Sequence, residues 1–231
     1  MSIEFDERTH TYRSGERTLI SVTTLLSSWF KKFNPVETLR MMRSKPNWSQ
    51  SKYFGMTDEE IQSKWTADGV DASTKGTQLH AAIEEYYKTK TITLDTVEMG
   101  QFLRFAEQAN LNIAGLEQRV FDVEWGLAGT IDGLAHYGDE LDIYDWKRCK
   151  EMTQSYGYAI QPGLTHIPSS NFWKYSLQLN LYRALLEKSG KKVRRMFIVC
   201  FHPDHLDFQQ YEVGRIDVEK ILNTRLQKEL C

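Results

Sequence analysis

Two aspartates and a lysine, Asp132, Asp145 and Lys147, lie near the ends of one predicted β-hairpin, where together they could hold a divalent cation. The hairpin is indicated by Gly138-Asp139, which lies between two β-rich runs and is typical of a two-residue turn. If these residues form the turn, Asp132 and Asp145 lie opposite each other, because each is six residues from its own turn residue. Lys147 projects from the same face as Asp145, because side chains alternate along a strand.

Two facing carboxylates repel each other unless a cation lies between them. Mg²⁺ prefers oxygen ligands, keeps several waters and binds substrate phosphates. The hairpin therefore favours a magnesium site beside a phosphate group. The alternative is a pair of solvated surface carboxylates with an exposed lysine, because a short D-(x)n-D-x-K pattern often arises by chance.

Two predicted helices add polar side chains at helical spacing. His80 and Glu84 share one face of the first, and Gln178 and Tyr182 share one face of the second. A neutral imidazole suits Mn²⁺ better than Mg²⁺. The glutamine amide could hold the lysine or a nucleotide, and the tyrosine could contact a phosphate or stack on a base. The alternatives are a satisfied core histidine and an ordinary amphipathic helix.

The chain has 231 residues, of which 41% are hydrophobic, so it is long and apolar enough to bury the core of one domain. Its net charge of −2 argues against a globally basic nucleic-acid coat but permits local basic clusters. Such clusters occur at 31–32, 147–150 and 188–195. Each could equally be a solvated face.

The three cysteines, Cys149, Cys200 and Cys231, share no close spacing, so they predict neither a disulfide framework nor a zinc site. They are too few for a four-cysteine iron–sulfur cluster. This usage is typical of a reducing, intracellular compartment. No apolar run approaches about 18 residues and the N-terminus lacks a signal-peptide core, so we expect no membrane span and an intracellular location.

The order of predicted elements indicates an α/β layered domain. The irregular segment 149–170 is long for a loop in a compact domain, which favours a functional role. The expected elements are a hairpin at 9–20 turning at 14–16, a helix capped by Ser21 and reaching about 33, a helix from the capping box at 57–60 to about 65, helices at 73–90 and 95–110, strands at 117–125, 127–137 and 140–148, a helix at 171–188, strands at 193–202 and 207–213, and a helix from 217.

Four motifs in this order resemble the PD-(D/E)XK nuclease superfamily, within it the RecB-like and mitochondrial genome maintenance exonuclease branch. They are G-T-x-L-H-x-x-x-E at 76–84, G-T-I-D-G at 129–133, D-W-K at 145–147 and Q-x-x-x-Y at 178–182. Tyr12 with the segment 21–26, Trp65, and Asn171-Phe-x-Lys-Tyr175 are similar to small viral and phage members. The resemblance covers about residues 10–205.

The resemblance implies one domain over 1–231 with a restriction-endonuclease-like core, in which helices flank a central mixed β-sheet. Residues 1–70 would form an N-terminal hairpin and helical extension, 71–215 the catalytic core and 216–231 a C-terminal helix. The segment 149–170 and the N-terminal helices could then arch over the site, so that only a strand end or a single strand threads through.

Site residues follow from the same resemblance. His80, Asp132, Asp145 and the backbone carbonyl of Trp146 would bind Mg²⁺ or Mn²⁺. Asp145 stands where the family more often has glutamate, which shortens the reach of its carboxylate by one methylene. The other implied residues are Lys147, Gln178 and Tyr182 as catalytic, Glu84 and Glu117 as further acidic positions, and Ser21, Lys75, Arg148 and Lys150 as contacts to substrate.

The implied function is a divalent-metal-dependent DNA exonuclease acting on single strands or ends in replication, recombination or repair. DNA is the expected partner, and a replication or recombination protein is considered as a second. No iron–sulfur cofactor is inferred. Three alternatives stay open: a flap endonuclease, an RNA-directed nuclease on the same fold, and an inactive nucleic-acid-binding module.

Overall fold

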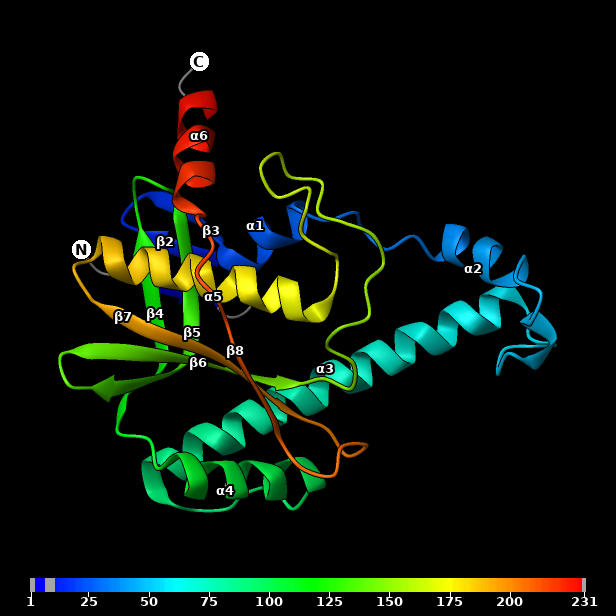
Figure 1. Ribbon diagram of the computed structural model, residues 1–231, viewed down its shortest axis with the longest axis horizontal. Helices are drawn as coiled ribbons and strands as arrows, with labels where there is room; N and C mark the ends of the chain where they lie inside the picture. Colours follow the sequence, from blue (N-terminus) through cyan, green and yellow to red (C-terminus); the bar gives the residue numbers. More distant parts are fainter. Residues whose placement is uncertain (1–2, 7–10, 230–231) are drawn as a thin grey trace.

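A mixed eight-stranded sheet lies at the centre of the computed structural model, which describes residues 3–6 and 11–229 (Figure 1). The strand order is β1-β2-β3-β5-β6-β7-β8, and β4 pairs with β5. The strands are β1 (Glu4–Asp6), β2 (Thr11–Ser14), β3 (Arg17–Ser21), β4 (Ile113–Asp122), β5 (Leu127–Tyr137), β6 (Glu140–Arg148), β7 (Val193–Phe201) and β8 (Gln209–Glu212). The helices are α1 (Val22–Ser28), α2 (Pro35–Arg43), the 3₁₀ turn η1 (Trp48–Gln50), α3 (Asp58–Thr89), α4 (Val97–Ala109), α5 (Asn171–Lys188) and α6 (Glu219–Glu229). This arrangement confirms the expected α/β class with helices flanking a mixed sheet.

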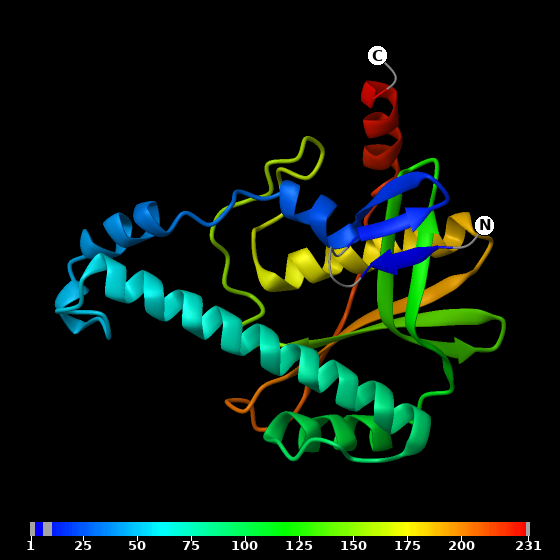
Figure 2. The ribbon, with the colours of Figure 1, turned by 180° about the vertical axis from the view of Figure 1, so that it is seen from behind.

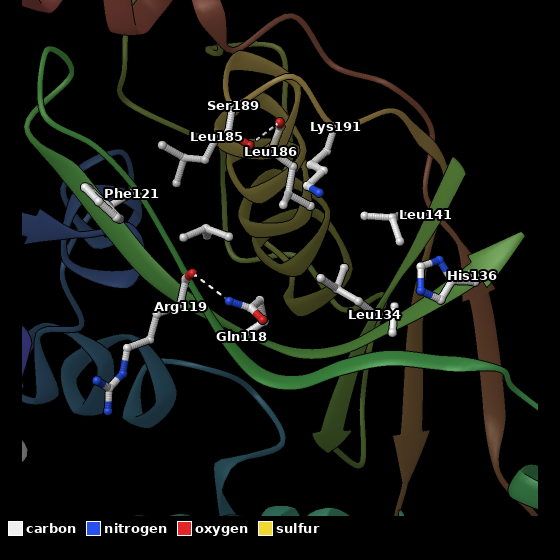
Figure 3. A pocket seen from close by; sticks show the side chains of 12 residues that line it. Gln118, Arg119, Phe121, Leu134, His136, Leu141, Leu185, Leu186, Ser189 and Lys191 are labelled. Carbon is white, nitrogen blue, oxygen red and sulfur yellow. Dashed lines mark hydrogen bonds between the residues drawn. The ribbon is translucent and has the colours of Figure 1, made fainter. Parts of the chain in front are cut away.

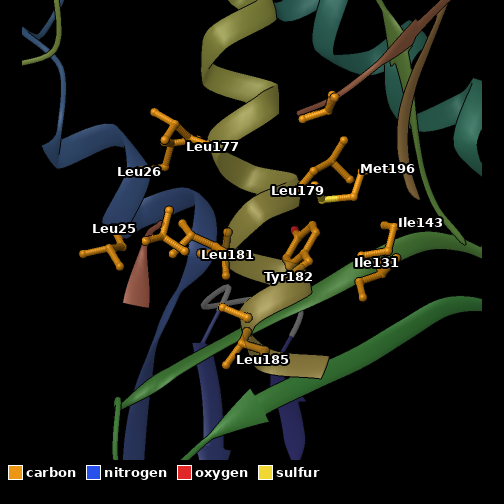
Figure 4. Packing of buried hydrophobic residues seen from close by; sticks show 14 of the residues in the cluster. Leu25, Leu26, Ile131, Ile143, Leu177, Leu179, Leu181, Tyr182, Leu185 and Met196 are labelled. Atoms are coloured by element: carbon orange, nitrogen blue, oxygen red, sulfur yellow. The ribbon is translucent and has the colours of Figure 1, made fainter. Parts of the chain in front are cut away.

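Helices cover both faces of the sheet. On one face α1 and α5 pack against the strands through a large apolar cluster that includes Leu26, Ile131, Ile143 and Leu181 (Figure 4). On the other face α3 and α4 pack through a second cluster rich in aromatic rings. The core of β5 and β6 is therefore buried from both sides, and polar side chains there must find partners within the protein.

The predicted hairpin between β5 and β6 is confirmed in turn and in register. Gly138 adopts a positive φ of 59°, as the turn requires, and Tyr137 pairs with Glu140. The ladder ends at Gly133 opposite Tyr144, so the predicted pair of Asp132 and Asp145 lies one step beyond it and is not formed. The predicted helix at 171–188 and the absence of helix and strand over 149–170 are also confirmed. Residues 9–10 of the first predicted hairpin lie outside the described residues, and its turn at Gly15 is confirmed.

Two helix predictions in the N-terminal part are wrong. Ser21 caps α1 as expected, accepting a hydrogen bond from Thr24 N, but the helix ends at Ser28 rather than near residue 33. Phe30 instead forms a β-bridge with Ala159. A separate helix, α2, follows, with Asn34 as its cap and Pro35 in its first turn. Proline disfavours helical geometry at the preceding residue, so one helix could not run through Asn34.

The predicted break between helices near residues 65–73 is also wrong, because α3 is one helix of 32 residues. The capping box is present: Thr57 and Glu60 satisfy each other's backbone amides. Gly69 costs about 1 kcal/mol relative to alanine but does not stop a helix that contains no proline. Ion pairs at i, i+4 spacing, Lys64 with Asp68 and Lys75 with Asp71, span the weak stretch. The expected boundary at residue 70 thus lies inside α3.

None of the described helices is long and apolar enough to cross a membrane.

Gly129 on β5 lies against α5. An added Cβ would be 2.6 Å from Cε1 of Tyr182, far inside van der Waals contact. At Gly76 on α3, nothing lies within 4 Å of an added Cβ. We therefore expect Gly129→Ala to lower the free energy of unfolding by about 2 kcal/mol, and Gly76→Ala, its matched control, to raise it by about 1 kcal/mol. Urea denaturation followed by circular dichroism measures both, and equal effects of the two substitutions would contradict this packing.

Candidate metal centre

The candidate site lies where one edge of β5 has no paired strand. One edge of β5 pairs with β3 only at Leu127 and Ala128, and with β6 only from Gly133 onward. Between these stretches, residues 129–132 have β4 alone beside them. Asp132 is the last residue of this gap, at the point where β5 and β6 separate.

A side chain replaces the missing strand pairing at this point. The backbone N–H of Trp146, the second residue beyond the last paired one on β6, donates to Oδ2 of Asp132 at 2.8 Å. A buried amide without a partner costs free energy, so this carboxylate satisfies β6 where the ladder ends. Asp132 is thereby held at a fixed angle, and its other oxygen stays available.

Gly133, which follows Asp132, lets the ring of Trp146 lie against β5. A Cβ at Gly133 would lie 2.8 Å from the ring of Trp146. Gly129 admits Tyr182 in the same way on the other face. The glycines of the G-T-I-D-G motif thus allow two large side chains to pack closely on either side of the aspartate.

His80 on α3 reaches this point from the face of the sheet that α3 covers. Its Nε2 is 2.7 Å from the carbonyl oxygen of Trp146, and its Nδ1 is 3.8 Å from Oδ2 of Asp132. A carbonyl oxygen only accepts, so Nε2 carries the hydrogen and Nδ1 of a neutral ring presents a lone pair toward the carboxylates. Metal-binding histidines commonly donate their second N–H to a backbone carbonyl in this way.

Glu117 on β4 completes a group of three possible ligands. One ligand atom from each of His80, Glu117 and Asp132 lies within 4.8 Å of the others. Glu117 has a φ of 45°, uncommon for a residue other than glycine. Its neighbours Leu116 and Gln118 pair with Gly133 and Ile131, which brings Glu117 level with Asp132. Sequence reasoning had assigned Glu117 only a secondary place.

Burial, followed by the charges of Asp132 and Glu84, raises the pKa of Glu117 to about 7. The half-buried carboxyl group thus resists ionisation beside other acids, and a cation at this point would relieve the repulsion. Glu84, the other secondary residue, faces this group from α3 and is ion-paired with Lys88 at 2.5 Å.

Asp145 and Lys147 form a buried ion pair on β6. Nζ of Lys147 lies 2.7 Å from Oδ1 of Asp145, whose side chain is 1% exposed. Oδ2 of Asp145 is buried and has no hydrogen-bond partner among the described residues. Burial raises the pKa of Asp145 to about 6 against the attraction of Lys147. A buried carboxylate oxygen left without a partner is costly, and a bound cation would relieve that cost.

Lys147 remains protonated in this arrangement. Burial acts to lower its pKa, but Asp145 and Asp132 together outweigh burial and raise it above the usual lysine value. Nζ also lies over the ring of Tyr175 at 5.0 Å, a cation–π contact. The sequence indicates Tyr175 only as the last residue of the Asn171-Phe-x-Lys-Tyr175 pattern and assigns it no contact with Lys147.

Gln178 and Tyr182 support Asp145 from α5. Nε2 of Gln178 donates to Oδ1 of Asp145 at 3.3 Å and to the hydroxyl of Tyr182 at 3.1 Å. Tyr182 is 3% exposed and packs in the core, so it is not placed to stack on a base (Figure 4). Both residues are brought together with Asp145, and they position it.

The four residues expected to contact substrate are not among the possible metal ligands, and each already has a partner within the protein. Arg148 and Lys75 line one cavity of about 270 Å³ together with Gln78, two residues before His80 on α3. The observed partners are Thr24 for Ser21, the cap of α1; Asp71 for Lys75; Glu98 for Arg148; and Asp204 for Lys150.

A larger cavity, of about 430 Å³, lies between β4, β5 and the C-terminal end of α5 (Figure 3). Its floor is apolar, with Leu134, Leu141 and Leu185, and its polar lining includes Arg119 and Lys191. No carboxylate lines it. It is therefore separate from the group of acids around Asp132.

The donor set fits a divalent cation of the Mg²⁺ or Mn²⁺ type. Three carboxylates supply hard oxygen ligands, and Nδ1 of His80 adds the imidazole that favours Mn²⁺. The Trp146 carbonyl accepts from His80 and keeps a second lone pair. Asp145 lies outside the group of three, and its unpartnered Oδ2 is the oxygen it would offer.

Protonation of Glu117 is expected to stabilise the metal-free protein as the pH falls from 8 to 6. Glu117 has a folded pKa of about 7, above its ordinary value of 4.5. Its contribution is complete below the unfolded pKa and is lost as the pH rises through 7. In EDTA, the Tm at pH 6 minus the Tm at pH 8 should therefore be more positive for wild type than for Glu117→Gln.

Asp145 is shifted in the same direction, with a pKa of about 6. The lowered pKa values of Cys149 and His202 act in the opposite sense in both proteins, so the comparison between wild type and Glu117→Gln isolates Glu117. Glu59→Gln, on the exposed first turn of α3, is the matched control. A pH response that is the same in Glu117→Gln and in wild type would contradict the environment assigned to Glu117.

The solved structures that are similar to this chain include three at low sequence identity. The protein SSO0001 is 17% identical, with 69% of this chain and 67% of its own covered and a TM-score of 0.34. The alkaline exonuclease LHK-Exo from Laribacter hongkongensis is 12% identical, with coverages of 92% and 86% and a TM-score of 0.44. A provisionally named exonuclease from Eubacterium rectale is 13% identical, with coverages of 58% and 50% and a TM-score of 0.37. No family model and no curated protein matches the chain.

Proposed function

We propose that this protein is a divalent-metal-dependent nuclease that hydrolyses DNA phosphodiester bonds, acting as an exonuclease on single strands or ends. The observation that carries the proposal is the convergence of His80, Glu117 and Asp132 within 4.8 Å, beside the buried Asp145–Lys147 pair. The four ordered motifs that resemble the PD-(D/E)XK superfamily contain all of these residues except Glu117. A role in replication, recombination or repair, in a small viral or phage protein of the RecB-like branch, belongs to the same proposal.

Each residue has a role that its contacts support. His80, Asp132 and Glu117 would hold the ion, with Oδ2 of Asp145 facing it. A bound Mg²⁺ or Mn²⁺ supplies charge neutralisation on the phosphate and a water of lowered pKa. Lys147, protonated and held by Asp145 and Tyr175, would donate a hydrogen bond to a phosphate oxygen or orient the attacking water.

Lys147 is not assigned as a general base, because its pKa lies above the usual lysine value in the metal-free protein. Gln178 and Tyr182 are positioning residues, since they reach the site only through Asp145. Arginine at position 147 would replace the compact ammonium beside Asp145 and Tyr175 with a larger, planar guanidinium. We expect Lys147→Arg to lose about a hundredfold in rate while still binding metal, and near wild-type turnover would remove any role for a compact ammonium.

The test is a single-stranded DNA labelled at its 5′ or 3′ end, incubated with Mg²⁺ or Mn²⁺ beside EDTA. An exonuclease produces a metal-dependent ladder from one end, and the label reveals the polarity. Cleavage of covalently closed single-stranded circles would favour an endonuclease, and cleavage of RNA alone an RNA-directed enzyme. No cleavage of any nucleic acid with either ion would overturn the proposal in favour of a binding module.

A further inference from the structure

Residues 31–56, which we call the arm, contain α2 and lie against the N-terminal end of α3, away from the sheet (Figures 1 and 2). The arm packs on α3 through a small cluster in which Leu39 and Tyr53 of the arm and Ile61 of α3 are buried. Residues 66–78 of α3, between this cluster and the sheet, are almost entirely exposed. No residue of the arm belongs to the two large apolar clusters on the sheet, so the arm does not contribute to the main core.

The arm is strongly basic in an otherwise acidic protein. It carries six lysines and arginines and a single acid, Glu37, giving a formal charge of +5, while the whole chain has −2. Lys31 is paired with Glu37, and Arg43 with Asp58. The other four basic side chains are exposed and form no ion pair with any described residue; they are Lys32, Arg40, Lys45 and Lys52.

Aromatic rings alternate with these cations. Phe33 is 67% exposed and Phe54 is 59% exposed, although both are large and apolar. Arg43 lies over the ring of Trp48 at 4.9 Å, and Lys52 over that of Tyr53 at 5.0 Å. Exposed rings among unpaired cations are typical of surfaces that bind single-stranded nucleic acid, because bases stack on the rings and phosphates pair with the cations.

Contacts between lysines and aromatic rings also occur between the arm and the candidate site. Lys147 lies over Tyr175, and the next residue toward the N-terminus of α5, Lys174, lies over Phe30 at 5.3 Å. Phe30 is bridged to Ala159 of the irregular segment and directly precedes the arm. Two further exposed rings, Tyr156 and Tyr158, occupy that segment at 78% and 62% exposure.

We propose that the arm, together with the exposed rings of residues 156–158, binds the single-stranded nucleic acid whose end is cleaved at Asp132 and Asp145. This inference deepens the proposed function and rests on it. Ile61 and His80 are nineteen residues apart on α3, or about 28 Å at 1.5 Å per residue. At 3.4 Å per stacked nucleotide, a strand needs about eight nucleotides to contact both places.

Binding of a 5′-fluorescein 20-nucleotide DNA in EDTA, followed by anisotropy across a salt series, tests the proposal without cleavage. The variant Lys32→Gln/Lys45→Gln/Lys52→Gln should bind about tenfold more weakly. Its slope of log affinity against log salt should be smaller in magnitude by about 2, at about 0.7 per lost phosphate contact. Wild-type affinity should rise with strand length up to at least about eight nucleotides, and the variant should lose most of this increase.

The matched control is Lys191→Gln/Lys192→Gln/Lys220→Gln, the same charge change at exposed lysines outside the arm. It should bind within about twofold of wild type. Phe33→Leu keeps an apolar side chain but removes the stacking face, so it should bind about tenfold more weakly, while Phe33→Tyr should bind like wild type. Circular dichroism of every variant establishes that it is folded.

The outcomes separate this inference from the proposed function. Equal binding by the arm variant and wild type, or equal loss in the arm variant and the control, would overturn the assignment of the arm. If wild type cleaves DNA while the arm variant binds normally, only the arm assignment fails. If wild type binds through the arm but cleaves nothing, only the proposed catalysis fails.

Discussion

Asp145→Asn is expected to lower the rate of DNA cleavage by about a thousandfold while the protein stays folded. Asparagine keeps the shape of the side chain and can still meet Gln178. It lacks the charge that holds Lys147 at 2.7 Å and the unpartnered carboxylate oxygen assigned to the ion. The same labelled single-stranded DNA assay measures the loss.

Asp142 on the same strand provides the matched control. Its carboxylate is also buried, but it pairs with Arg194 through Oδ2 at 2.5 Å, away from the acids around Asp132. Asp142→Asn should keep cleavage within a few-fold of wild type and lose about 2 kcal/mol of stability through the weakened ion pair. If Asp142→Asn abolished cleavage as fully as Asp145→Asn, the effect would be one of folding and not of chemistry.

The turns and helix caps of this fold are predictable from the sequence. Gly138-Asp139 predicts both the turn and the register. A two-residue turn pairs Tyr137 with Glu140, and each later pair follows one residue farther along both strands. Ser21 and Thr57 predict helix starts, because each side chain bonds an amide three residues away. Interactions of this range depend on neighbours that the sequence itself displays.

The missed features depend on partners far away in the sequence. The continuity of α3 depends on whether two ion pairs offset the helix-destabilising effect of Gly69. No single residue in the sequence predicts that outcome. The positive φ of Glu117 occurs between residues of β4 that pair with Ile131 and Gly133, on either side of Asp132. The bond from Trp146 N to Asp132 forms where β6 no longer pairs with β5. The candidate ligands were therefore identifiable by motif, whereas the inclusion of Glu117 in the group within 4.8 Å required the assembled sheet.

His80 has contacts that its helical spacing alone does not predict. A histidine on a helix is more often a packed or solvated side chain than a ligand. Here the carbonyl of Trp146 accepts a hydrogen bond from Nε2–H of His80, which leaves Nδ1 on the side of Asp132. Because Trp146 immediately follows Asp145 in the D-W-K motif, the strand that supplies one carboxylate also orients the imidazole.

Adding Mn²⁺ is expected to raise the Tm of the wild-type protein by about 5 to 10 °C. An ion at a hundred times its dissociation constant stabilises the folded state by about 2.7 kcal/mol. For a chain of this length, each kcal/mol shifts the Tm by about 2 to 4 °C. The gain should be larger at pH 8 than at pH 6, because the pKa of Glu117 is about 7 and protons compete with the ion below it.

Asp132→Asn should remove most of this shift, because Asp132 is the carboxylate nearest to His80 and its loss leaves two candidate ligands in the group. Asp142→Asn should retain the full shift, since its carboxylate is engaged by Arg194. Differential scanning fluorimetry with Mn²⁺, Mg²⁺ or EDTA makes the comparison without any substrate. A shift that persists in Asp132→Asn would place the ion elsewhere, and the absence of any shift in wild type would remove the metal centre from which the proposed function is built.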